Sequence, residues 1–234
     1  MYGFQPNSPG AFAEFVVRKE ANLHKIPDSM DYETASLVEP ISVAFHAVWQ
    51  IARGIKPTDT VLIFGAGPIG LFALIIAKSS SAKVVNIDPI KKRRDLAHEL
   101  GADEVLDPSS GNQVQEILKL TGGVGGNIAF ETSGSDIARE VLPDVVDCGG
   151  QIILIGISKP KKIPFELEKL ISKGLVMKGA EGSPLMFPQT IKFLDEHEDS
   201  FTKVISHRLP LSRAMDAFRL ADDRDNAEKI LLNA

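Results

Sequence analysis

The sequence predicts an α/β protein whose core is a doubly wound, six-stranded parallel sheet, with a second, smaller lobe built from both chain ends. From residue 61 onward, short apolar runs alternate with segments of helical pattern. The apolar runs show no polar alternation, which indicates strands covered by helices on both faces. A glycine-rich turn follows the first run, as in sheets that bind a ligand over the carboxyl ends of their strands.

The strands and helices of this sheet are expected to follow one another with short connections. The strands are expected at 61–64, 84–87, 104–106, 128–131, 152–155 and 175–177. The helices between them are expected near 69–78, 91–100, 112–120, 135–146 and 165–172. Gly101 and Gly174 come just after two of these helices, where a C-cap favours a residue of positive φ.

The flanks are expected to form the small lobe. The N-terminal flank has one strand-like stretch, Phe12–Val17, and a helix from about Pro40 to Ala52. The C-terminal flank predicts a helix at 188–197, a strand at 203–207, a helix that begins at Ser212 and a strand at 229–232. We therefore expect residues 46–184 to form the sheet domain, and residues 1–45 and 185–234 to meet in the other lobe.

The glycine motif is the most specific feature of the sequence. Gly65-Ala66-Gly67-Pro68-Ile69-Gly70 separates an apolar run from a helix pattern, and Asp88 ends the next apolar run. Gly65 allows a tight turn, Gly67 lets a pyrophosphate approach the backbone, and Gly70 lets the helix pack close to the sheet. Pro68 suits the first helical position, and the helix N-terminus attracts the diphosphate. The motif predicts a dinucleotide site, although a glycine-rich turn in another α/β protein is the simpler alternative.

Asp88 indicates NAD rather than NADP. A carboxylate at this position accepts hydrogen bonds from both ribose hydroxyls and repels a 2′-phosphate. The basic run Lys91-Lys92-Arg93-Arg94 could instead hold that phosphate. We favour its interpretation as a solvated helix start, because Asp88 precedes it.

Composition excludes several classes of function. The formal net charge of −5 gives no reason to expect a nucleic-acid partner, and no apolar run approaches the length of a membrane span. The single cysteine, Cys148, excludes an internal disulfide, and we expect it to be a small buried residue at the end of a helix. These features favour a cytoplasmic protein.

Several further motifs resemble the medium-chain dehydrogenase/reductase superfamily, which includes zinc alcohol, polyol and threonine dehydrogenases. The resemblance covers essentially the whole chain. The matching stretches are Gly10–Val17, Ile26–Asp28, Ala35–Val48, Leu100–Asp103, Phe130–Gly134, Gly149–Gln151 and Ile205–Leu211. In this family a Rossmann domain is joined to a GroES-like catalytic lobe.

The resemblance implies specific cofactor contacts. The pyrophosphate loop of the family is matched by Gly65, Gly67, Pro68, Ile69 and Gly70, and its ribose and adenine contacts are matched by Asp88 and Arg93. On the nicotinamide side, the strand end beside the ribose is matched by Thr132 and Ser133, the segment along the ring by Ile155, Gly156 and Ile157, and the backbone at the carboxamide by Ala180 and Glu181. A cation that reaches the pyrophosphate is loosely matched by Lys229. NAD(H) and a small alcohol or polyol are the implied ligands.

Glu39 matches an acid that lies at the catalytic zinc in the polyol branch, directly or through water. The alternative is a helix-start acid placed before Pro40 at the first helical position. His46 and His207 are expected to be packed residues rather than proton carriers.

The sequence departs from the family in its metal ligands. The family's cysteine ligands and Gly-His-Glu motif have no counterpart here, and a zinc site for hydride transfer needs about three protein ligands. Zinc is therefore expected in the family but is not supported by this chain, unless a partner adds ligands to Glu39.

The resulting hypothesis is an NAD-dependent alcohol or polyol dehydrogenase-like protein that is catalytically impaired as this short chain. A non-catalytic NAD(H)-binding module or partner subunit is the alternative, and a zinc-free reductase is a third. We expect a dimer or tetramer in which the last sheet strand, 175–178, pairs across a twofold axis.

Overall fold

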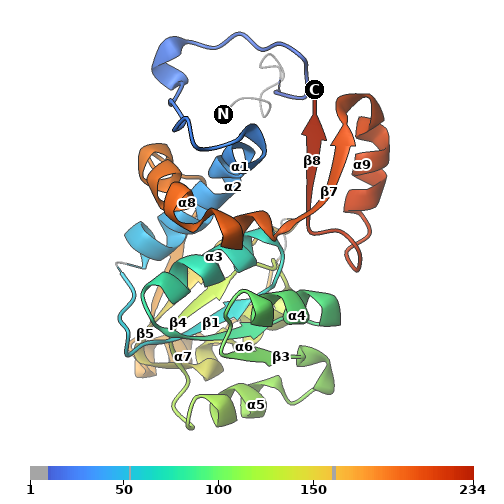
Figure 1. The fold of residues 1–234 in the computed structure, drawn as a ribbon. Coiled ribbons are helices and arrows are strands. Elements are labelled where there is room, and N and C mark those ends of the chain that lie inside the picture. Colours follow the sequence, from blue (N-terminus) through green and yellow to red (C-terminus); the bar gives the residue numbers. More distant parts are fainter. Residues whose placement is uncertain (1–9, 53, 160–161) are drawn as a thin grey trace.

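The computed structural model describes residues 10–52, 54–159 and 162–234 of the chain, and its centre is a parallel sheet (Figure 1). The six strands lie in the order β3-β2-β1-β4-β5-β6. Their bounds are β1 (Thr60–Phe64), β2 (Lys83–Ile87), β3 (Glu104–Leu106), β4 (Gly126–Glu131), β5 (Val146–Leu154) and β6 (Val176–Gly179). The doubly wound sheet is thus confirmed, and its order reverses between β1 and β4.

Helices cover both faces of the sheet. They are α3 (Pro68–Ser79), α4 (Lys91–Glu99), α5 (Gln113–Leu120), α6 (Asp136–Val145) and α7 (Leu167–Ser172), with a short 3-10 turn η3 (Pro108–Ser110). Alternate residues of β1 enter different cores: Ile63 packs with α3, whereas Leu62 packs with α5 and α6. This two-sided burial explains why the strands read as continuous apolar runs.

The N-terminal flank begins its helices earlier than expected. It contains η1 (Glu20–Asn22), α1 (Tyr32–Ser36), α2 (Val38–Phe45) and a π-helical turn η2 (His46–Ile51). Asp31 caps α1 by accepting a 2.7 Å hydrogen bond from the N–H of Thr34. Pro40 is consequently the third residue of α2 rather than the first residue of a helix.

The expected strand at Phe12–Val17 is wrong. These residues have no strand pairing, and the side chains of Phe15 and Val17 are 89% and 92% exposed. An apolar stretch becomes a strand only where a second strand satisfies its backbone groups.

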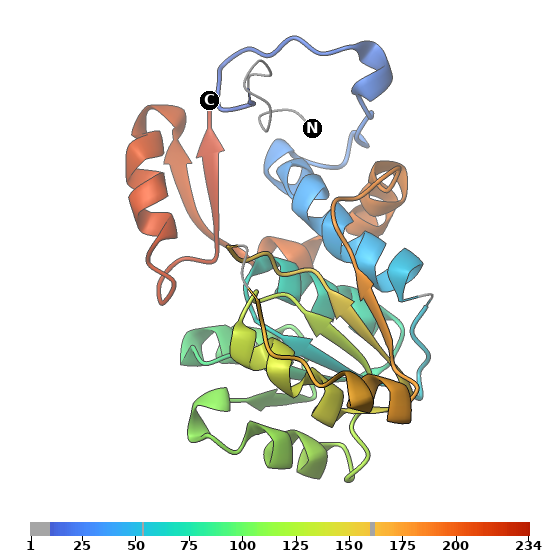
Figure 2. The same ribbon diagram turned by 180° about the vertical axis from the view of Figure 1, so that it is seen from behind.

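The C-terminal flank forms a small two-stranded unit. It consists of α8 (Phe187–Thr202), β7 (Ile205–Pro210), a 3-10 turn η4 (Leu211–Arg213), α9 (Ala214–Ala221) and β8 (Lys229–Asn233). β7 and β8 pair in parallel. Residues 10–30 arch toward this unit in both views, and the rings of Phe12 and Phe218 lie 5.9 Å apart (Figures 1 and 2). The N-terminal flank thus contacts this unit through Phe12, but both strands of the unit come from the C-terminal end rather than from the two ends of the chain.

The flanks share a core with the sheet domain. Ile41 of α2 and Leu194 and Phe201 of α8 are fully buried in the same cluster as Phe72 of α3. The rings of Phe72 and Phe201 lie 5.6 Å apart. This packing fixes α2 and α8 beside α3.

The structure confirms the expected conformation of Gly101 and Gly174 but not the expected burial of Cys148. Gly101 and Gly174 have φ values of +101° and +61°, as their C-cap positions require. Cys148 is exposed and lies within β5, so its expected burial at a helix end is wrong. The strand begins at Val146, immediately after α6, and this early start carries Cys148 to an exposed position near the strand's beginning. None of the helices in the described part of the chain is long and apolar enough to cross a membrane.

Candidate functional site: a cavity over the glycine loop

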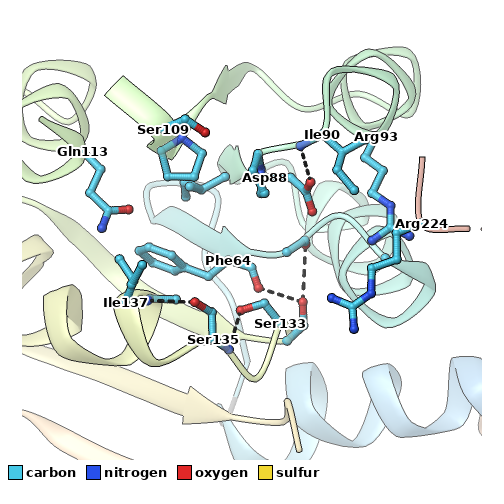
Figure 3. Close-up of a pocket in the computed structure, with 17 residues that line it drawn as sticks. Phe64, Asp88, Ile90, Arg93, Ser109, Gln113, Ser133, Ser135, Ile137 and Arg224 are labelled. Atoms are coloured by element: carbon cyan, nitrogen blue, oxygen red, sulfur yellow. Dashed lines mark hydrogen bonds between the residues drawn. The ribbon is translucent and has the colours of Figure 1, made fainter. Parts of the chain in front are cut away.

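A cavity of about 490 Å³ lies over the carboxyl ends of β1, β2 and β4, at the reversal of strand order (Figure 3). Arg93 and Arg224 lie at one end of it, and Gln113 and Ile137 lie at the other. Its walls combine the glycine loop and Asp88 with apolar side chains such as Phe64. This position and mixed lining are typical of a nucleotide site in an open α/β sheet.

The three glycines of the loop differ in what they allow. Gly65 has a φ of +104°, and a Cβ on Gly70 would overlap the carbonyl oxygen of Gly65. Gly67, by contrast, has an ordinary φ of −72°, and a Cβ there would meet only Arg93 Nη1, at 3.8 Å. Gly65 and Gly70 are therefore needed by the protein itself, whereas Gly67 leaves room at the cavity, where a pyrophosphate would lie.

The helix after the loop begins at Pro68, as predicted, with Gly67 as its N-cap. As a glycine, Gly67 has no side chain with which to cap this end of α3. Its free N–H groups and partial positive charge are directed at the loop, which suits an anion.

Asp88 is the buried carboxylate of the cavity, with 4% of its surface exposed. Its Oδ2 accepts a 2.7 Å hydrogen bond from the N–H of Ala66, and its Oδ1 accepts one of 2.8 Å from the N–H of Ile90. These bonds hold the carboxylate between the glycine loop and the start of α4. Each oxygen retains a lone pair for a ribose hydroxyl.

The basic run after Asp88 is only partly a solvated helix start. Lys91 and Lys92 are exposed, but the side chains of Arg93 and Arg94 are 15% and 14% exposed. Arg94 Nη2 lies 2.9 Å from Asp107, and Arg93 Nε lies 3.1 Å from Glu228 Oε1. The two arginines are held in ion pairs, so the expectation of a wholly solvated run is wrong for them.

The ends of β4 and β5 are joined by a buried ion pair. Glu131 is fully buried and accepts hydrogen bonds from the N–H groups of Ser133 and Gly134 and from Arg139 Nε. Arg139 also donates to the carbonyl of Gly156, at 2.6 Å. The pair thus orients the two loops that contain Thr132–Ser133 and Ile155–Ile157.

Thr132 directs its hydroxyl toward β1 rather than into the cavity. Its Oγ1 donates to the carbonyl of Phe64 at 2.8 Å. Ser133 is exposed at the cavity, and Ile157 is 82% exposed on the neighbouring loop. The predicted nicotinamide-side residues accordingly lie on two adjacent loops.

Ala180 and Glu181 follow β6, and the residues after them contact α2. The N–H of Ala180 donates to the carbonyl of Leu154 at 2.8 Å. His46 Nδ1 lies 3.1 Å from the carbonyl of Gly182, and His46 is buried, as expected of a packed residue. His207 is half-buried, with Nδ1 2.9 Å from Ser206 Oγ.

Glu39, far from Lys229 in the sequence, acts electrostatically on the Lys229 ammonium. Burial lowers the pKa of the Lys229 ammonium, and the carboxylate of Glu39 partly opposes this shift. Glu39 itself is exposed in the first turn of α2. Glu39 belongs to α2 and Lys229 is the first residue of β8.

The donor set does not fit a zinc ion. Within 10–52, 54–159 and 162–234, no three His, Cys, Asp or Glu side chains are grouped so that they could hold a metal ion. Glu39 stands without further ligands among these residues.

Sequence reasoning missed several residues of the site. Gln113, Ile137 and Arg224 line the cavity, but their segments have no motif that marks them. Glu131 had a detectable signal, because a carboxylate at the end of a buried strand needs several donors.

The family model of zinc-binding dehydrogenases matches residues 68–196. The chain is 31% identical to (R,R)-butanediol dehydrogenase of Neisseria gonorrhoeae, over 96% of this chain and 63% of that protein. It is 33% identical to L-threonine 3-dehydrogenase of Rhizobium etli, over 99% of this chain and 66% of that protein. An alcohol dehydrogenase of E. coli CFT073, solved with NADH, superposes with a TM-score of 0.89 at 26% identity, over 97% of this chain and 67% of that one. The chain therefore spans about two thirds of the length of these relatives.

Proposed function

This chain belongs to the zinc-binding dehydrogenase family, and from that premise we propose that its cavity binds NAD(H). The single observation that carries the proposal is the spare room at Gly67, beside a helix N-terminus and a buried carboxylate. A Cβ at Gly67 would project toward the cavity, in which the diphosphate has space to approach the backbone. The match of the family model and the NADH-bound relative support the same ligand class.

The residues of the cavity have distinct roles in this proposal. The apolar end around Gln113 and Ile137 would receive the adenine ring, and Asp88 the hydroxyls of its ribose. The N-terminus of α3 would bind the pyrophosphate, with Lys229 reaching it from β8. The loops of Thr132–Ser133 and Ile155–Ile157, together with Ala180 and Glu181, would then border the nicotinamide.

We further propose that the family reaction served by this cavity is hydride transfer between the nicotinamide and a small secondary alcohol or polyol. The bound nicotinamide supplies the hydride chemistry, while the residues of this chain orient it and exclude water from one of its faces. Because Glu39 lacks companion metal ligands in the described segments, we expect little turnover from this polypeptide alone.

The test is a titration of the purified chain with NADH, followed by nicotinamide fluorescence, with zinc measured on the same sample. We expect saturable binding at micromolar to millimolar cofactor and far less than one zinc per chain. Absence of saturation would refute cofactor binding. One tightly held zinc per chain, with robust alcohol oxidation, would instead refute the expected impairment.

A non-catalytic NAD(H)-binding module is a second candidate, and the same lack of grouped metal donors favours it. It predicts NADH binding that persists when no alcohol is oxidised, even after zinc is added.

A dimer formed through β6, an edge strand of the sheet, and a cytoplasmic location remain part of the proposal. Light scattering that gives a monomer would contradict the dimer.

A further inference from the structure

Glu228 is a buried carboxylate in the segment that leads into β8, where it bonds Arg93, a residue that lines the cavity. Its side chain is 5% exposed. Oε1 accepts the hydrogen bond from Arg93 Nε, whereas Oε2 is buried and has no hydrogen-bond partner among the described residues. A carboxylate normally accepts several hydrogen bonds when it is removed from water, so this half-satisfied group needs an explanation.

The surroundings of Glu228 join the two parts of the molecule. The segment 222–228 approaches the start of α4, where Lys92 Nζ donates to the carbonyl of Asn226 at 3.2 Å and Arg93 Nη2 donates to that of Ala227 at 3.4 Å. On the other side, the N–H of Glu228 donates to Ser206 Oγ of β7 at 2.9 Å. Glu228 does not itself line the cavity; it is thereby fixed behind Arg93, the residue that does.

Arg93 is the cation that a 2′-phosphate would need. An arginine close to the ribose acid is the usual means by which a dinucleotide fold accepts NADP. Arg93 lines the cavity with Asp88, and its Nη1 is the nearest atom to the space at Gly67. Its Nε and Nη2 are already engaged by the segment 222–228.

The other cations of the basic run have partners other than Glu228. Lys91 pairs with Asp95 on its own helix, and Arg94 pairs with Asp107 and donates to the carbonyl of Asp88. Of these acidic partners, only Glu228 is buried; the side chains of Asp95 and Asp107 are 61% and 44% exposed. Glu228 therefore acts on Arg93 with less screening by water than the exposed pairs experience.

We propose that Glu228 is a second determinant of cofactor choice, which neutralises Arg93 and adds a negative charge behind Asp88, so that the site rejects a 2′-phosphate. The inference rests on the proposed function, because it concerns the same cavity. Asp88 and Glu228 interact electrostatically, so a phosphate at the ribose would meet two carboxylates. The ribose hydroxyls of NAD, which are neutral, meet no such penalty.

The experiment compares the dissociation constants of NADPH and NADH for the unmodified chain and for E228Q, by fluorescence titration at constant ionic strength and at about pH 8, where the Glu228 carboxyl is ionised. Glutamine keeps the volume and removes the charge. We expect E228Q to shift the ratio of the two constants toward NADPH by about tenfold, since an arginine released from its carboxylate can form a charge-assisted bond to the phosphate. The double variant R93M/E228Q should lose most of this gain.

E99Q is the matched control. Glu99 lies on the same helix as Arg93 and pairs with Lys203 at 2.9 Å, but its side chain is 59% exposed and does not line the cofactor cavity. Its ratio should equal that of the unmodified chain. E228S, with circular dichroism of both variants, provides a second replacement if E228Q folds poorly.

The outcomes separate the two claims. If NADH binds but the ratio is unchanged in both E228Q and E228S, Glu228 does not determine cofactor choice. If the gain in NADPH affinity survives in R93M/E228Q, the proposed role of Arg93 is wrong. If the unmodified chain binds neither cofactor, the proposed function itself fails, and this inference fails with it.

Discussion

Arg139 Nε lies 3.0 Å from Oε2 of Glu131, a carboxylate with no solvent exposure. The ion pair holds two loops at once. Glu131 accepts a hydrogen bond from the N–H of Gly134, in the loop after β4, and Arg139 donates one to the carbonyl of Gly156, in the loop after β5. Both loops assigned to the nicotinamide are therefore bonded to this buried ion pair.

The first prediction concerns this pair. E131Q should destabilise the chain by about 3 kcal/mol, because it leaves Arg139 without its carboxylate and places an amide where donors converge. The melting temperature, measured by differential scanning calorimetry, checks this. E140Q, an exposed position on α6, is the control and should change little. Equal melting temperatures of E131Q and the unmodified chain would show that the pair is not a stabilising contact.

Two glycines of the loop should have different effects when they are replaced, one on cofactor binding and the other on stability. G67A should lower NADH affinity at least about tenfold with little change in stability, because the Cβ enters only the space meant for the cofactor. G70A should instead lower the melting temperature, because its Cβ overlaps the Gly65 carbonyl. Cofactor titration and thermal melts of both variants test the contrast. A G67A chain that binds NADH normally would contradict the position assigned to the diphosphate.

Glu228 predicts a pH dependence of stability. Burial raises its pKa from 4.5 to about 7, while Arg93 partly opposes the shift. The folded state therefore holds this proton more tightly than the unfolded chain, so that its contribution to stability falls as pH rises from about 4.5 to about 7. E228Q should lose that part of the slope. Urea unfolding at pH 5.5 and pH 8 measures it, and an identical slope in both chains would count against the raised pKa.

We expect the Lys229 ammonium to lower the stability of the fold and to strengthen NADH binding. Burial lowers the pKa of its ammonium, so the charged form costs stability in the fold. K229M should keep or slightly raise the melting temperature and should weaken NADH binding severalfold, if the ammonium reaches the pyrophosphate. K203M, which removes an exposed cation paired with Glu99, serves as the comparison. A K229M chain with unchanged NADH affinity would remove Lys229 from the site.

The parallel sheet could be predicted because its strands are buried on both faces and its loop obeys strict spacing. Leu62 and Ile63 point into different cores, which makes the run continuous in the sequence. Phe12–Val17 has a similar local composition but no pairing strand beside it. The local pattern of apolar residues indicates which side chains can be buried, whereas the pairing of a strand depends on segments elsewhere in the chain.

The site was predictable where one segment supplies it and not where distant segments meet. Gly65 to Asp88 lie on consecutive elements, so their spacing encodes the geometry. Glu228 and Arg93 are separated by 135 residues, and nothing local marks either as the partner of the other. Cys148 was misplaced because a boundary between a helix and a strand cannot be located to within a few residues from pattern alone.

The core shared by α2, α3 and α8 has a consequence for the way this molecule can be divided. Ile41, Phe72 and Leu194 belong to one cluster, although they come from both flanks and the sheet domain. Cutting the chain at the predicted boundaries would expose this cluster on every fragment. We therefore expect heat to melt the flanks and the sheet in a single transition, and we expect no excised nucleotide domain of this chain to remain folded.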